Sequence, residues 1–326
     1  MTTLPLQQIW NPRYPLTRLR QSDWTKISLG AALITSLFIL FQYFGSPPGI
    51  GGHGRSALKW LIERWNDVGI SMGSGDYSHG FLVPIASAYI LWQQKDELIQ
   101  TPKRVTPAAL ILILGCLFLH YVGFITQHHR LSIISLIGLS WSIPFYLYGF
   151  QVAKRLLFPC AFLMFAVPLN FLDQLTFPLR IVNTRVSVDV LQILGLDVRQ
   201  VGTAIYGPPF DATATLKLDV ADPCSGIRSL TAMMALTAIY GYVVLKGIWR
   251  RWLLFICAIP LAMAGNIFRI VSIGIMAEAI DTRLATGLPH DYAGFIVFGF
   301  AIALMVALSI LLQREFYIPG KPHVRF

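Results

Sequence analysis

Long apolar stretches separated by short polar segments dominate this chain of 326 residues. Several stretches approach the roughly 18 to 20 residues that cross a bilayer as a helix. The pattern predicts an all-α polytopic membrane protein with about eight transmembrane helices, an outer interfacial helix and a small β-hairpin. The predicted spans are Ile27–Phe44, Gly80–Trp92, Pro107–Ile125, Leu131–Tyr148, Leu156–Leu172, Leu230–Leu245, Trp252–Ala279 and Tyr292–Leu312.

Two longer polar segments separate spans on the predicted outer side. The first, Gly45–His79, contains an amphipathic stretch from Ala57 to Val68. In the second, residues 173–229, polar side chains interrupt apolar ones between Leu175 and Leu194, which is typical of an interfacial helix. An alternation of apolar and polar residues then predicts two short strands, Val198–Tyr206 and Thr213–Val220.

Composition agrees with a membrane protein. Hydrophobic residues make up 55% of the chain and charged residues 13%, against roughly 25% charged in soluble domains. The net charge of +10 does not indicate nucleic-acid binding, because basic residues collect in the cytoplasmic loops of membrane proteins. We therefore expect the lipid bilayer, and no nucleic acid, as a partner.

The distribution of Lys and Arg predicts the orientation. We expect residues 1–26 to be a cytoplasmic segment without a cleaved signal peptide, 27–312 a transmembrane domain and 313–326 a cytoplasmic tail. The two short outer loops then hold only Arg130 and Arg283. The predicted cytoplasmic segments hold Arg13, Arg18, Arg20, Lys26, Lys95, Lys103, Arg104, Lys154, Arg155, Lys246, Arg250, Arg251, Arg314, Lys321 and Arg325.

One cysteine differs from the other three in its surroundings. Cys116, Cys160 and Cys257 lie inside apolar runs, where a thiol is normally a small hydrophobic group. Cys224 lies in a polar segment just before the sixth predicted helix, where the positive helix terminus favours a thiolate. The four cysteines show no paired spacing, so we expect no disulfide framework, no metal site and no cofactor.

Other polar residues are predicted on the same side of the membrane as Cys224. Asn266 and Arg269 are three apart in the seventh helix and share a face. Arg269 lies about 17 residues from the inner surface, roughly 26 Å along the helix. His290, next to Asp291, begins the eighth helix and can act as base and then acid. Cys224, Arg269 and His290 would form an acyl-transfer set.

Each residue also has a plainer interpretation when taken alone. Cys224 is also compatible with a purely structural role. Arg269 is also compatible with a side chain that extends to the lipid headgroups, and His290 with a residue that only begins a helix. Arg228 is four residues after Cys224 on the same helical face. His79 also faces the outer side and is an alternative base or a substrate-binding residue.

The motifs around these residues resemble the exosortase/archaeosortase family of membrane-embedded cysteine transpeptidases. The similar segments are Cys224–Ser229, Asn266–Arg269, His290–Asp291 with Gly294, and Ser78–Pro84. The resemblance covers roughly residues 77–312 and implies Cys224, Arg269 and His290 as catalytic residues. It further implies the bacterial branch and an inner-membrane location with the active site on the outer face. In contrast to some exosortases, the chain ends soon after the eighth predicted span, so we expect no fused accessory domain. This difference leaves open a specialised subfamily, such as a cyanobacterial type.

The resemblance also implies a substrate class. Exosortases are thought to process membrane proteins whose C-terminal sorting signal holds a short PEP-CTERM motif, a hydrophobic helix and a basic tail. Cleavage would produce a thioester that an amine or water resolves. Three alternatives remain: a transporter, a scaffold in exopolysaccharide export, and a thiol-dependent lipid acyltransferase.

Overall fold

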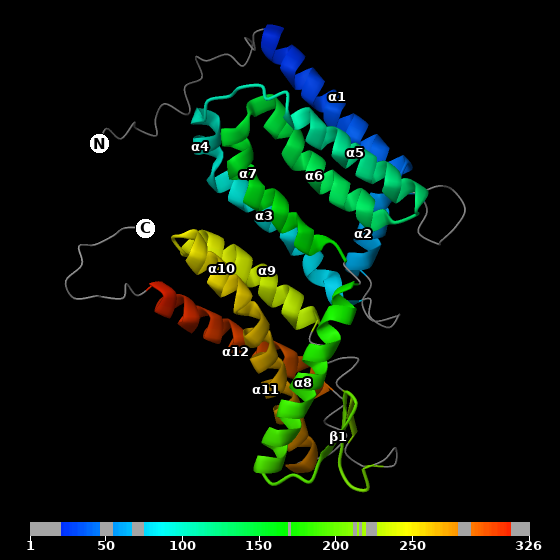
Figure 1. The fold of residues 1–326 in the computed structure, drawn as a ribbon, viewed down its shortest axis with the longest axis vertical. Coiled ribbons are helices and arrows are strands. Elements are labelled where there is room, and N and C mark those ends of the chain that lie inside the picture. The colour runs from blue at the N-terminus through cyan, green and yellow to red at the C-terminus, as the bar shows by residue number, and fades with distance from the viewer. Residues whose placement is uncertain are drawn as a thin grey trace, which may run out of the picture.

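The computed structural model describes residues 21–45, 55–66, 75–168, 171–210, 214, 217–219, 227–279 and 288–313, most of them helical (Figure 1). The helices are α1 (Gln21–Tyr43), α2 (Ala57–Asn66), η2 (Gly75–Phe81), α3 (Leu82–Gln93), α4 (Lys95–Gln100), α5 (Ala109–Ile125), α6 (His129–Tyr148), α7 (Phe150–Phe162), η3 (Leu163–Ala166), α8 (Phe171–Ile193), α9 (Ile227–Val244), α10 (Ile248–Ile256), α11 (Ala258–Ala279) and α12 (Leu288–Gln313). The strands are β1 (Arg199–Val201), β2 (Ala204–Tyr206) and β3 (Lys217–Asp219). A helical protein with a small β element is therefore confirmed.

Each of the eight predicted spans contains a helix, but the helices differ in length. Among the described residues, two are long and apolar enough to cross a bilayer, His129–Tyr148 and Ile248–Ala277, the second of which joins α10 to α11. α3 has 12 residues and α7 has 13, which is about 18–20 Å of helix against a hydrocarbon core of about 30 Å. The number of eight spans stays a prediction.

The fifth predicted span, Leu156–Leu172, is not one continuous helix. α7 ends at Phe162 and passes into the short helix η3. Val167 then has φ −92° and ψ 122°, which is extended backbone. Val167 precedes Pro168, and the proline ring excludes the helical conformation at the preceding residue. The apolar pattern alone gave no sign of this break.

The helices form two groups that meet at α9 (Figure 1). The first group contains α1 to α7, with close packing of α5 on α6 and of α6 on α7. The second contains α8 to α12 and the sheet. α9 belongs to the second group but also contacts α7 and η2. Ala235 of α9 packs in a core with Val83, Phe162 and Ala166, so α9 joins the two groups.

Large apolar side chains are exposed on both groups. Leu29 of α1 is 71% exposed, Ile111 of α5 74% and Trp249 of α10 84%. Water-soluble proteins rarely expose so many large apolar side chains, whereas helices that face lipid do. The surface therefore agrees with a membrane location.

The loops predicted to be cytoplasmic lie together at one end of the molecule. Glu97 of α4 forms an ion pair with Arg155 of α7. The Gln94 side chain donates a 2.7 Å hydrogen bond to the Tyr242 hydroxyl of α9, and the Arg251 guanidinium lies 4.9 Å from the Tyr242 ring centre. The start of α1 and the end of α12 lie on the same side in Figure 1. Which membrane face this is stays a prediction.

The opposite end of the first group is built around α2. The amphipathic stretch predicted from Ala57 to Val68 forms a helix to Asn66, with Trp60 4% exposed. The Trp60 ring stacks on His129 of α6 at 5.6 Å between ring centres. The Trp65 indole donates a 2.8 Å hydrogen bond to the Ala166 carbonyl oxygen. α2 thereby fixes η3 and the start of α6.

The helix predicted from Leu175 to Leu194 is confirmed as α8, which ends at Ile193. One face packs along α11, where Val188 and Leu191 form a core with Ile270 and Ala277. Leu191 is fully buried. The location of α8 at the membrane interface stays a prediction.

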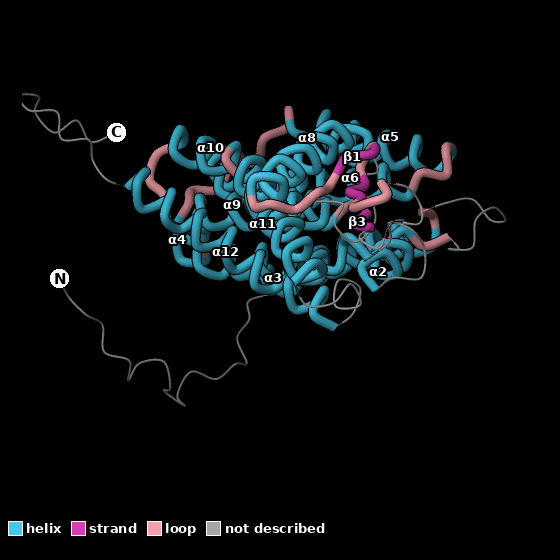
Figure 2. Tube along the Cα trace, turned by 90° about the horizontal axis from the view of Figure 1, so that it is seen from below, coloured by secondary structure: helices cyan, strands magenta, loops and turns pink. Residues whose placement is uncertain are grey.

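The β element differs from the expected hairpin. Its strands form a three-stranded antiparallel sheet in the order β1-β2-β3 (Figure 2). The prediction of one strand from Val198 to Tyr206 is wrong, because the chain reverses between Val201 and Ala204, which pair with each other. Gly202, with φ +65°, accommodates this tight turn. Ile205 is fully buried against α8, so the sheet belongs to the α8–α11 core.

Candidate active site

Cys224 lies outside the described residues, three positions before α9 begins at Ile227. Arg228 lies in the first turn of α9, and its side chain is outside the description as well. α9 contacts η2, α8, α11 and α12. Those contacts include the elements that carry His79 (η2), Asn266 and Arg269 (α11), and His290 and Asp291 (α12). The helix after the predicted nucleophile therefore touches every element that carries another predicted site residue.

The other three cysteines lie within the helical packing or beside it, and all three are free thiols. Cys160 is 7% exposed and accepts a 3.7 Å hydrogen bond from Ser140. The carbonyl oxygen of Cys116 accepts a 2.6 Å hydrogen bond from Ser135 of the neighbouring helix α6. These contacts agree with the structural role expected of cysteines in apolar runs.

α11 carries Asn266 and Arg269 on one face, as their spacing predicts. The face also includes Ile270 and Ile273, which are 2% and 6% exposed. Asn266 is 5% exposed, and Arg269 is half-buried. Arg269 precedes the last residue of α11, Ala279, by ten positions, which corresponds to about 15 Å along the axis. The arginine is thus held within the helix packing and not at the helix end.

His290 lies in the first turn of α12, where the sequence predicts it. The side chains of His290 and Asp291 are outside the description. α12 packs along α11, and the rings of Phe268 and Phe300 stack at 5.0 Å between centres. The approach of His290 to Cys224 and Arg269 stays a prediction.

His79 is the predicted site histidine whose side chain the structure describes. It lies in η2, half-buried, and its Nε2 is 3.2 Å from the carbonyl oxygen of Phe165 in η3. A carbonyl accepts only, so Nε2 carries the proton in this bond, and in the neutral ring the lone pair is then on Nδ1. The next residue, Gly80, has no space for a larger side chain, because a Cβ there would overlap the Trp65 indole. Trp65 and Phe165 therefore fix the position of His79.

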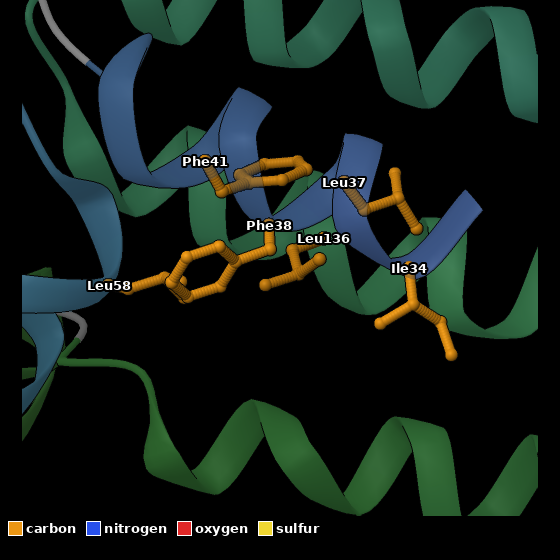
Figure 3. A pocket seen from close by; sticks show the side chains of 6 residues that line it. All are labelled: Ile34, Leu37, Phe38, Phe41, Leu58 and Leu136. Atoms are coloured by element: carbon orange, nitrogen blue, oxygen red, sulfur yellow. The ribbon is translucent and has the colours of Figure 1, made fainter. Parts of the chain in front are cut away.

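Other parts of the described structure offer little chemistry. No group of three or more His, Cys, Asp or Glu side chains in the described residues is placed to hold a metal ion. A pocket between α1, α2 and α6 is lined by apolar side chains only, as Figure 3 shows: Ile34, Leu37, Phe38, Phe41, Leu58 and Leu136. It includes none of the predicted site residues.

Comparison with known families identifies the chain. A family model described as transmembrane exosortase (Exosortase_EpsH) matches residues 65–307. The chain belongs to the transmembrane exosortase family. No curated protein and no solved structure matches it. As an exosortase, the protein is a membrane protein of a transpeptidase family.

The family match covers all the predicted site residues of this exosortase. His79 lies near its start, and Cys224, Arg228, Asn266 and Arg269 lie within it. His290 and Asp291 precede its end. Because the family model matches the region as a whole, the match does not assign a catalytic or binding role to any single residue.

Three polar side chains of α8 in this exosortase are buried, which the sequence pattern did not predict. Asn183, Thr184 and Ser187 of α8 are 4%, 0% and 0% exposed, although polar residues of an interfacial helix were expected to face water or headgroups. Arg185 and Asp189 of the same helix are exposed. Arg180, Asn183, Thr184 and Ser187 are three or four positions apart, which places them on one face of a helix. This spacing is the feature of the sequence that indicates a common polar face.

Proposed function

We propose that this exosortase is a membrane-embedded cysteine protease or transpeptidase that cleaves C-terminal sorting signals of the PEP-CTERM type from membrane proteins. The family match carries the proposal, because its range includes Cys224, Arg269 and His290 in the order that the family resemblance requires. The contacts of α9 with η2, α11 and α12 support it, since these elements carry the other candidate residues.

The proposed reaction begins with proton transfer from the Cys224 thiol to His290. The thiolate attacks the scissile carbonyl carbon and forms a tetrahedral intermediate. The C–N bond then breaks, and His290 returns the proton to the leaving amine of the C-terminal fragment. The N-terminal fragment remains as a thioester on Cys224. An amine or water attacks the thioester and releases the thiol.

Arg269 is the proposed electrostatic partner in this reaction. A guanidinium in the membrane interior is costly and is usually retained for a function. Here it would stabilise the thiolate or the oxyanion of the tetrahedral intermediate, with Asn266 on the same face as a further donor. Arg228 and Asp291 are proposed to support Cys224 and His290.

His79 is proposed to support the site from η2. Its Nε2 bond to Phe165 orients the ring and places the lone pair on Nδ1. His79 is proposed either to bind the substrate or to serve as base in place of His290. The first of these roles needs only a hydrogen-bond acceptor, and the second needs an ionisable ring.

The proposed location is the bacterial inner membrane, with both termini cytoplasmic and the site on the outer face. The supporting observation is that basic loops lie together around Glu97, Arg155 and Tyr242. Basic loops are retained on the cytoplasmic side. α2, η2 and η3 would then lie at the outer end.

Co-expression with a protein that ends in a PEP-CTERM signal tests the proposal. The wild type should convert the substrate to a shorter form, and Cys224→Ala and Cys224→Ser should leave it full length and membrane-bound. Cys257→Ala is the matched control, because Cys257 lies in the turn between α10 and α11. Mass spectrometry of the product locates the cleaved bond.

Normal processing by Cys224→Ala would reject the cysteine mechanism. A trapped acyl-enzyme that carries a lipid chain in place of a peptide would assign the chain to acyl transfer. Flux of a solute without cleavage would favour a transporter.

A further inference from the structure

The turn between α9 and α10 exposes basic and aromatic side chains at one tip of the molecule (Figure 1). α9 ends at Val244 and α10 begins at Ile248, so the turn is short, and the two helices pack against each other. Residues 241–256 include three basic residues, Lys246, Arg250 and Arg251, and no Asp or Glu. The turn therefore concentrates positive charge that no acidic residue of the same segment balances.

The length of the following helix sets the depth of this turn. α10 and α11 form one apolar helical stretch, Ile248–Ala277, of 30 residues. At 1.5 Å per residue it is about 45 Å long, against a hydrocarbon core of about 30 Å. Even at the usual tilt of about 20°, about nine of its residues lie outside the hydrocarbon. Arg250 and Arg251 are in its first turn, so the start of α10 is the part expected at the level of the headgroups.

The two neighbouring arginines have different surroundings. Arg251 is half-buried, and its Nε donates a 2.9 Å hydrogen bond to the Leu245 carbonyl oxygen. Its guanidinium also lies 4.9 Å from the Tyr242 ring centre. Arg250 and Lys246 are exposed, and neither forms an ion pair or a side-chain hydrogen bond with any residue that the structure describes. Arg251 therefore holds the end of α9, whereas Arg250 and Lys246 present their charges outward.

Two tryptophans are close to Arg250 in the sequence and are exposed with it. Trp249 is 84% exposed and Trp252 54%. Tryptophan is enriched at the headgroup level of membranes, where the ring contacts lipid and the indole N–H reaches polar atoms. Ile248, beside them, is 61% exposed, which agrees with contact to lipid and not to water. The cations of this turn thus lie where lipid phosphates are available.

We propose that the α9–α10 tip, formed by Lys246, Trp249 and Arg250, binds the headgroup of an anionic phospholipid in the leaflet on its side of the membrane. The three side chains offer N–H donors only, and a phosphodiester offers acceptors only. A zwitterionic headgroup carries its own cation, which weakens its attraction to Lys246 and Arg250. The proposal does not depend on the proposed function, because Cys224 precedes the opposite end of α9.

Native mass spectrometry of the full-length protein in a neutral detergent tests the proposal. The protein is titrated with dioleoyl phosphatidylglycerol or dioleoyl phosphatidylcholine, which share their acyl chains and differ in headgroup charge. We expect the wild type to bind phosphatidylglycerol at least about tenfold more tightly. Lys246→Gln and Arg250→Gln should each weaken this binding about fivefold, the usual contribution of one basic residue at an anionic surface, and leave phosphatidylcholine unchanged.

Lys154→Gln is the matched control, because Lys154 is an exposed basic residue of α7 outside the tip and should keep the wild-type affinity. Arg250→Lys should retain most of the affinity, and Trp249→Ala should weaken both lipids, since its ring contacts lipid of either charge. A wild-type melting temperature without lipid shows that Arg250→Gln is folded. Equal affinity of the wild type for the two lipids overturns the proposal. So does an equal loss in Lys154→Gln and Arg250→Gln, or a preference that survives loss of both Lys246 and Arg250.

Discussion

Gly274 of α11 lies directly against the side chain of Leu191 in α8. A Cβ added to Gly274 would be 2.9 Å from Leu191 Cδ2 and 3.1 Å from its Cδ1. Leu191 is fully buried, so it has little space to move. The absence of a side chain at Gly274 is what lets α8 approach α11, and the core that Leu191 forms with Ile270 and Ala277 depends on that approach.

Gly274→Val should therefore lower stability by about 1–3 kcal/mol, the usual cost of overpacking a core. Thermal unfolding in detergent, followed by loss of soluble monomer on size-exclusion chromatography, measures the change. Gly299→Val in α12 is the control, because a Cβ there meets no atom within 4 Å. Equal losses in the two variants would contradict the close packing of α8 on α11.

His79 gives a test that separates an orienting role from a basic one. His79→Gln keeps an N–H donor for the Phe165 carbonyl oxygen, whereas His79→Ala removes it. We expect His79→Gln to retain most processing and His79→Ala to lose it, because the proposed base is His290. Substrate conversion in the co-expression assay measures both variants. If His79→Gln were as inactive as His79→Ala, the ionisable imidazole of His79 would become the better candidate for the base.

Gly80→Ala should disturb the same region through packing. Its Cβ would overlap the Trp65 indole, which is bonded to the Ala166 carbonyl oxygen. We expect a lower melting temperature and reduced processing, because Trp65 must move and η3 moves with it. Gly115→Ala in α5 meets open space and should behave as wild type in both measurements. If the Gly80→Ala variant processed the substrate as well as the wild type, the hypothesis that the position of Trp65 matters for the active site would be rejected.

His120 of α5 provides a prediction about stability alone. It is 5% exposed, neither ring nitrogen has a hydrogen-bond partner, and the ring lies 4.4 Å from that of Phe41. Burying an unpaired polar group costs about 1–3 kcal/mol. His120→Phe should thus leave stability unchanged or raise it, as measured by thermal unfolding. A marked loss of stability would mean that the imidazole makes a bond that matters for folding.

Thiol labelling tests the predicted topology. An impermeant maleimide added to intact spheroplasts should label Cys224 and leave Cys116, Cys160 and Cys257 unlabelled. Cys160 is 7% exposed within the helices, and the other two are half-buried. Single-cysteine variants assign the signal to each position. Labelling of Cys224 only after the membrane is permeabilised would reverse the proposed orientation.

The sequence alone determined the kind of protein and most of its helices. Eight apolar runs predicted the regions of α1, α3, α5, α6, α7, α9, α11 and α12, because burial of apolar side chains in lipid or protein follows the local pattern. The spacing of Asn266 and Arg269 fixed their common face, since it depends only on the helical repeat. The motif around Cys224 led to the exosortase family.

The tertiary structure decided what depends on contacts between distant segments. The turn at Gly202 divides one expected strand into two, because pairing of Val201 with Ala204 needs β2 to return against β1. Asn183 is buried because α8 packs against α9, α11 and the sheet, although α8 alone has the amphipathic pattern of an interfacial helix. His79 is fixed by Phe165, 86 positions away in sequence. A sequence pattern describes which side chains share a face, and only the packing of the whole chain determines what that face meets.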